Sequence, residues 1–94
     1  MNPRDLEFLK NLRLENPLGA ALAELVCDTT MRVWNGHYHV PEFSEHVAKA
    51  GTTVLIWTTS RFGDIGITDR LSGAFGYDAR VDPECLVNYR WKEG

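Results

Sequence analysis

The dipeptide Asn35-Gly36 lies between two runs of alternating side chains and is the strongest signal for local structure in this sequence. Asn-Gly favours a two-residue β-turn, because both central residues of that turn need a positive φ. Such a turn fixes the strand pairing, so that Trp34 faces His37. The sequence therefore predicts a β-hairpin over residues 29–41. Its polar face holds Arg32, Trp34, His37 and His39, and its apolar face holds Met31, Val33, Tyr38 and Val40.

Two helix signals precede this hairpin. Asn2 can cap a helix that has Pro3 in its first turn, and Asn16-Pro17 repeats the same start signal. From there to about Cys27, apolar residues recur at the spacing of one helix face. These residues are Leu18, Ala21, Leu22 and Leu25. We therefore expect two short helices in a helical segment over residues 1–28.

The chain after the hairpin predicts mostly strands. Residues 42–50 are interpreted as one or two helical turns, with Phe43 and Val47 facing inward. Residues 53–59 have apolar side chains on both faces, which is typical of a strand covered on both sides. Further strands are expected over residues 65–68, 77–81 and 87–91, with a helical turn at residues 82–86.

These elements predict a single α+β domain over residues 1–94. Two short N-terminal helices would pack on a mainly antiparallel β sheet, since each needs the other to bury its apolar side. Four aromatic residues alternate as core residues do, and we interpret them as structural. They are Trp57, Tyr77, Tyr89 and Trp91.

The C-terminal half has a suggestive order of elements. Gly51-Thr-Thr-Val54-Leu-Ile56 is followed by a loop and Ile65-Gly66-Ile67, then by Tyr77 to Val81, a one-turn helix and Val87 to Trp91. In this order, residues 51–91 resemble a small SH3-like barrel of the KOW and Tudor type. The resemblance implies a partly open barrel that binds peptides, proteins or RNA, although a fold alone does not fix function.

Charge disfavours nucleic acid as a partner. The chain has 10 Lys and Arg against 13 Asp and Glu, and its formal net charge is −3. Neither half clusters the basic side chains that neutralise phosphates. No apolar stretch approaches the roughly 20 residues of a membrane-spanning helix. Charged residues also occupy the N-terminus, where a secretory signal would be apolar, so we expect a cytoplasmic protein without membrane contact.

The two cysteines, Cys27 and Cys85, lack the close spacing of a zinc pair or a redox motif. Free cysteine is among the most buried residue types, so we expect two buried thiols. A disulfide between them is the alternative.

The three histidines suggest a metal site, because His37 and His39 project from one strand face and His46 follows nearby. The predicted register places Arg32 opposite His39, and a fixed cation beside a metal ion is unfavourable. The sequence also has no nucleophile motif and no phosphate-binding glycine loop. We therefore predict no cofactor and no enzymatic activity. A metal-dependent enzyme using these three histidines is an alternative.

Aromatic and arginine side chains at the surface are the remaining candidates, because these residue types dominate protein interfaces. The predicted binding residues are Arg32, Trp34, His37 and His39 on the hairpin, with Arg61 and Phe62 in the loop before Gly63. They indicate a non-enzymatic protein-binding module, a small adaptor or an inhibitor of a larger protein or complex. An RNA-binding small barrel is a further alternative. An uncovered hairpin edge would also allow a homodimer.

Overall fold

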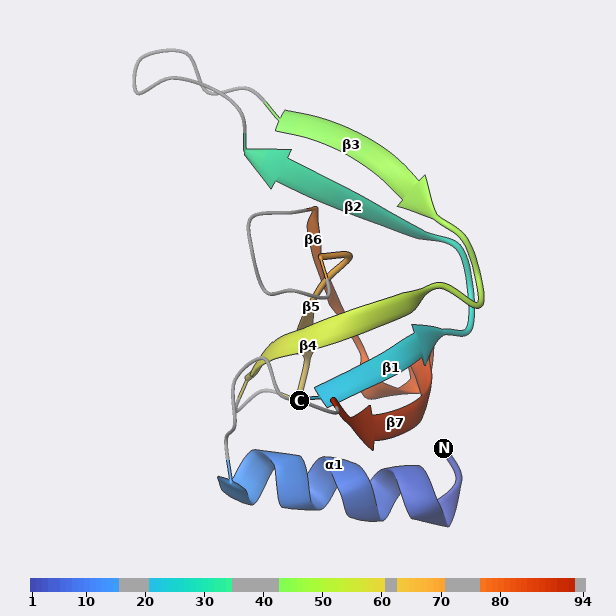
Figure 1. Ribbon diagram of the computed structural model, residues 1–94, viewed down its shortest axis with the longest axis vertical. Helices are drawn as coiled ribbons and strands as arrows, with labels where there is room; N and C mark the ends of the chain where they lie inside the picture. Colours follow the sequence, from blue (N-terminus) through green and yellow to red (C-terminus); the bar gives the residue numbers. More distant parts are fainter. Residues whose placement is uncertain (16–20, 35–42, 61–62, 71–76, 93–94) are drawn as a thin grey trace.

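The computed structural model describes residues 1–15, 21–34, 43–60, 63–70 and 77–92 (Figure 1). Its elements are the helix α1 (Pro3–Glu15), the strands β1 (Ala21–Leu25), β2 (Thr29–Trp34), β3 (Phe43–Ala48), β4 (Thr53–Thr59), β5 (Ile65–Thr68) and β6 (Asp78–Val81), the 3-10 helix η1 (Pro83–Cys85) and the strand β7 (Leu86–Trp91). In these ranges the structure is therefore mostly β. No helix among them has both the length and the apolar character needed to cross a bilayer.

The predicted α+β fold class, with two N-terminal helices on a sheet, is wrong because the second helical segment is the strand β1. Ala21, Ala23 and Leu25 are buried and alternate with the half-buried Leu22 and Glu24. This is the two-residue period of a strand. Ala21 and Leu25 lie on the inner side whether the residues repeat with the period of a helix or with that of a strand. The sequence of this short segment therefore fits both structures. Pairing with β4 on one side and β7 on the other selects the strand.

The predicted hairpin register is also wrong. β2 pairs with β3, so that Arg32 faces Glu45 instead of His39 and Trp34 faces Phe43. The residues predicted as helical turns over 42–50 instead supply β3. The connection between the paired strands is residues 35–42, which lie outside the described ranges.

One long, bent antiparallel ribbon explains this register. Ala21 faces Ile56 in the β1–β4 pair, and Thr29 faces Ala48 in the β2–β3 pair. The same one-to-one register therefore runs through both halves of the ribbon. The pairing of β2 is set by the strands on the other side of the bend, and the Asn-Gly signal does not decide it.

Backbone hydrogen bonds continue the ribbon into its bend. The N–H of Leu25 donates to the carbonyl of Thr52 at 3.0 Å, and the N–H of Gly51 donates to the carbonyl of Leu25 at 2.8 Å. Gly51 has a φ of 90°, which glycine adopts without a steric penalty. The Asp28 carboxylate accepts the N–H of Ala50 at 2.9 Å. This bond and the neighbouring lysine lower the pKa of Asp28.

The other strands curl the sheet around the ribbon. β5 pairs with β4, β6 pairs with β5, and β6 reaches β2 through the Arg32–Asp78 pair. The strand order is β3-β2-β6-β5-β4-β1-β7, and all pairs are antiparallel. The pairings lead from β1 through β4, β5 and β6 to β2. Because β2 is the continuation of β1 beyond the bend, they return to the same side of the ribbon (Figure 1).

Helix α1 lies across one end of the curled sheet, beside β7 (Figure 1). Its Leu9 and Leu12 side chains are buried in the core. The strands supply the other core residues, Ala21, Ala23, Leu25, Met31, Ala48, Val54, Ile56, Ile65, Ile67, Val81, Leu86 and Tyr89. The Arg13 guanidinium donates to the carbonyl of Gly63 at 2.9 Å, so the helix reaches from β7 to the β4–β5 connection.

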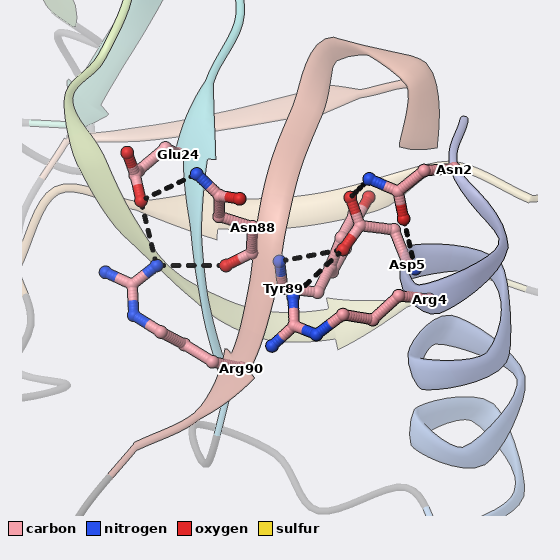
Figure 2. A network of polar contacts seen from close by, with 7 residues as sticks. All are labelled: Asn2, Arg4, Asp5, Glu24, Asn88, Tyr89 and Arg90. Carbon is pink, nitrogen blue, oxygen red and sulfur yellow. Dashed lines mark hydrogen bonds and ion pairs between the residues drawn. The ribbon is translucent and has the colours of Figure 1, made fainter.

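The predicted cap of α1 is confirmed, and it also joins the helix to the sheet (Figure 2). The Asn2 side chain accepts the N–H of Asp5 at 2.8 Å, and the Asp5 carboxylate accepts the Asn2 amide at 3.1 Å. The buried Asp5 carboxylate also accepts the N–H of Tyr89 in β7 at 3.3 Å. The Asp5 carboxylate thus accepts hydrogen bonds from the helix start and from the strand at the same time.

A β-bulge at Asn88 places Tyr89 in the core, where it was predicted. The pairing of β7 with β1 shifts by one residue between Leu22 and Glu24. Asn88 has a φ of 56°, a left-handed conformation that asparagine tolerates. Leu86 and Tyr89 are therefore both buried although they are three residues apart.

Trp57 and Trp91, which were predicted in the core, lie at the surface with exposed fractions of 40% and 41%. The β4–β5 register shifts between Ile56 and Thr58, so Trp57 leaves the alternation of its strand. Trp91 follows the bulge in β7, and its ring centroid is 4.6 Å from that of Phe8 in α1. The bulge in β4 therefore accounts for the exposure of Trp57, whereas Trp91 lies outside the core against the helix.

Replacing Asp5 with alanine should lower the free energy of unfolding by about 2 kcal/mol, because the buried N–H of Tyr89 and the Asn2 side-chain amide lose their acceptor. Urea denaturation measures this loss. Glu7→Ala is the control, because Glu7 is exposed on the same helix; its effect should stay within about 0.5 kcal/mol. Equal losses in the two variants would contradict the role of Asp5.

Gly66 in β5 has no room for a side chain. A Cβ atom there would lie 3.2 Å from the Trp57 indole and would collide with the Thr58 methyl group. Gly66→Ala should therefore cost about 1–3 kcal/mol of unfolding free energy. The cost should be smaller in a Thr58→Ser background, which lacks that methyl group. Denaturation of the four proteins tests this, and the same cost in both backgrounds would show that the methyl contact is unimportant.

Candidate functional site

The half of the ribbon beyond the bend, β2 with β3, extends away from α1 (Figure 1). We call these two strands the β2–β3 arm. The arm contains Arg32 and Trp34 of the predicted binding residues, and it contains His46 of the metal alternative. It is therefore the part of the described structure in which the sequence-based candidates can be compared.

One face of the arm is open to solvent. The Nε atom of Arg32 is 2.8 Å from a carboxylate oxygen of Glu45, its partner across the strands. Their side chains are 64% and 47% exposed, so this surface ion pair contributes little stability, about 0–1 kcal/mol. Val47 follows Glu45 on the same face of β3 and is 51% exposed. This face thus combines an ion pair with an apolar side chain.

The other face of the arm turns toward the core. Met31 is fully buried, and His46 is its partner across the strands. The His46 ring contacts Tyr77 edge-on with a centroid distance of 4.2 Å, and its Nε2 is 3.6 Å from the Asp69 carboxylate. Asp69 also accepts the N–H of Tyr77 at 2.9 Å. These contacts hold β3 against the residues that follow β5 and precede β6.

The described residues around His46 do not make a metal site. The cluster pairs one imidazole with one carboxylate, whereas a protein metal site usually supplies three or four ligands. In the described ranges no group of three His, Cys, Asp or Glu side chains could hold a metal ion. His37 and His39 lie outside those ranges.

Asp78 in β6 is a carboxylate in an unfavourable environment. Partial burial raises its pKa, a hydrogen bond with Thr68 lowers it, and the negative charge of Asp69 raises it further. The net effect is a raised pKa. Its backbone pairs with Arg32, and this is the one register pair between β6 and the arm in the described structure. The charged form of Asp78 is therefore disfavoured where the arm meets the rest of the sheet.

The structure describes only part of the predicted binding surface. Arg32 lies in the arm, and for Trp34 the described part is its backbone at the end of β2. The other predicted residues, His37, His39, Arg61 and Phe62, lie outside the described ranges. Gly63, which follows Phe62, bonds to α1, and α1 lies at the end of the molecule away from the arm (Figure 1).

The sequence interpretation missed three residues that contact the arm. Glu45 was placed in a helical turn, Asp69 was not singled out, and Tyr77, which does pack against the core as predicted, was not expected to meet the arm. Residues 43–48 are Phe-Ser-Glu-His-Val-Ala, in which polar and apolar residues do not alternate, so no clear local signal indicated a strand there. No local signal could have brought Asp69 and Tyr77 to His46, because these contacts join separate elements.

The two terminal strands of the sheet, β3 and β7, differ in how their outer edges are protected. The outer edge of β7 is covered by α1, since the Asp5 carboxylate accepts the N–H of Tyr89. Trp91 in β7 also packs against Phe8, and the bulge at Asn88 interrupts the strand. Helix cover and bulges are devices that stop a sheet edge from pairing with another chain.

β3 has none of these devices in the described part of the chain. It pairs with β2 in an unbroken register over its six residues, and its other side faces no described strand. Its sequence, Phe-Ser-Glu-His-Val-Ala, contains neither the proline nor the lysine that often blocks an edge. β3 is therefore a regular strand whose outer edge pairs with no other strand among the described residues.

No protein-family model matches this chain, and searches of curated proteins and of solved structures gave no significant match. The SH3-like resemblance of residues 51–91 stays a prediction. Function is therefore inferred from the arm and from the edges of the sheet.

Asp78→Asn should stabilise the protein at pH 7 more than at pH 3. A carboxyl group whose pKa is raised by folding holds its proton more tightly in the folded state. Its contribution to stability is lost as the pH rises from the ordinary value of 3.8 through the raised value. The neutral amide avoids this loss.

Urea denaturation of wild type and variant at both pH values gives the difference. Glu84→Gln, at an exposed position in η1, is the control for removing a negative charge. A benefit of Asp78→Asn that is larger at pH 3 would contradict the inferred environment of the carboxylate.

Proposed function

We propose that this chain is a protein-binding module that takes an extended segment of another protein along the free edge of β3. The contrast between the two terminal strands carries the proposal. The β7 edge is covered by α1 and interrupted by a bulge, whereas β3 is regular and uncovered in the described structure. A protein that protects one edge and leaves the other open has a ready site for strand addition.

Strand addition also gives the open face of the arm a role. Backbone hydrogen bonds supply affinity in this mode, and alternate side chains of the added strand supply specificity. Those side chains would lie beside Glu45 and Val47 on β3, with Arg32 behind them on β2. The site therefore favours a segment that has an apolar residue and a polar or charged residue two positions apart.

An adaptor or an inhibitor needs no chemistry beyond such an edge. It acts by occupying a segment of its partner or by holding that segment near another protein. We place this binding activity in the cytoplasm, where cysteines such as Cys27 and Cys85 are usually kept as free thiols.

Val47→Lys should weaken partner binding at least tenfold, since a lysine on an edge strand opposes strand pairing. Val26→Lys is the matched control. Val26 is 47% exposed, compared with 51% for Val47, but it lies at the bend and outside β3. Both changes alter the net charge equally, and both should leave the melting temperature within a few degrees.

Affinity capture from the source cell with the three proteins as baits identifies the partner, and titration with that partner measures the three affinities. Hydrogen exchange should then show increased protection of β3 amides in the complex. A partner that binds both variants like the wild type, without protecting β3, would disprove the proposed site.

A further inference from the structure

Cys27 and Cys85 are far apart in the sequence but adjacent at the bend of the ribbon. Cys27 lies between β1 and β2, and Cys85 is the last residue of η1. The pairing of β1 with β7 ends at Leu25 and Leu86. The next residue, Val26, donates its N–H to the carbonyl of Cys85 at 2.9 Å. The Cys27 side chain is also near enough to Cys85 to interact with it electrostatically.

The two thiols differ in their access to solvent. Cys27 is exposed, which corrects the prediction of two buried thiols, and Cys85 is half-buried. Burial raises the pKa of Cys85, and the neighbouring Cys27 adds to this effect. A small reagent therefore meets Cys27 first, with Cys85 beside it as a second thiol. This arrangement of an accessible thiol next to a partner thiol is typical of redox-sensitive cysteine pairs.

We propose that Cys27 and Cys85 form a reversible disulfide by exchange with a low-molecular-weight disulfide of the glutathione class. The Cys27 thiolate attacks one sulfur of the small disulfide, which forms a mixed disulfide at Cys27 and releases one small thiolate. The Cys85 thiol then loses its proton to solvent and attacks Cys27 Sγ. This step forms the Cys27–Cys85 bond and expels the second small thiolate.

The exchange is balanced in atoms and electrons. The two protein thiols lose two electrons and two protons, and the small disulfide gains them to become two thiols. Excess small thiol reverses both steps. A reversible bond of this kind suits a reducing compartment, where disulfides are transient and act as sensors.

The bond would fasten the bend of the ribbon to the start of β7. Cys27 lies two residues before β2, so oxidation would restrain the base of the β2–β3 arm. The inference does not depend on the binding function proposed for β3, and its test uses no partner.

The test incubates the full chain with fixed amounts of oxidised and reduced glutathione, followed by alkylation and mass spectrometry. We expect the wild type to form mainly the internal disulfide, seen as a linked pair of peptides containing Cys27 and Cys85. Cys85→Ser should instead accumulate glutathione on Cys27. Cys27→Ser should take up much less glutathione, because its remaining thiol is half-buried.

The wild type in urea is a control that needs no variant to fold. Unfolding separates the two thiols, so the ratio of internal disulfide to mixed disulfide should fall about tenfold or more. An unchanged ratio would overturn the proposal. Wild-type protein that retains glutathione on Cys27 as Cys85→Ser does, or that forms only disulfide-linked dimers, would also overturn it.

Discussion

The unbroken register of the bent ribbon is the constraint on which the rest of the structure depends. β1 pairs with β4 and β2 pairs with β3 in one continuous register, so the position of the bend decides which neighbours each half can reach. Before the bend β1 meets β7, and after it β2 meets β6. The left-handed Gly51 and the bond from Ala50 to Asp28 fix that position. The proposed disulfide would act at the same place.

Helix α1 completes the fold at the opposite end from the arm. The Asp5 carboxylate accepts hydrogen bonds from the Asn2 side-chain amide at the helix start and from the N–H of Tyr89, so the cap of the helix also covers an edge of the sheet. The Arg13 bond to Gly63 fixes the other end of the helix. With β7 covered in this way, β3 is the terminal strand that stays open in the described structure. The proposed function follows from this asymmetry.

Little of the candidate site could be predicted from sequence. Arg32 was chosen as a binding residue and does lie on the open face of the arm, but its partner Glu45 was not foreseen. His46 was considered as a metal ligand, whereas in the structure it contacts Tyr77 and Asp69. These contacts join residues from separate elements. A local pattern could not predict them, because it contains no information on which strands become neighbours.

The sequence by itself determined the elements whose signals are local and point to one structure. The cap at Asn2 confirmed the start of α1, and the strands β4 and β5 begin and end where their patterns predicted. Tertiary structure decided β1, because its short apolar pattern fits a helix and a strand equally well until β4 and β7 pair with it. It also decided the register of the arm, because one turn signal contributes less than two ladders of backbone hydrogen bonds that share one register on both sides of the bend, and these ladders exist only in the folded chain.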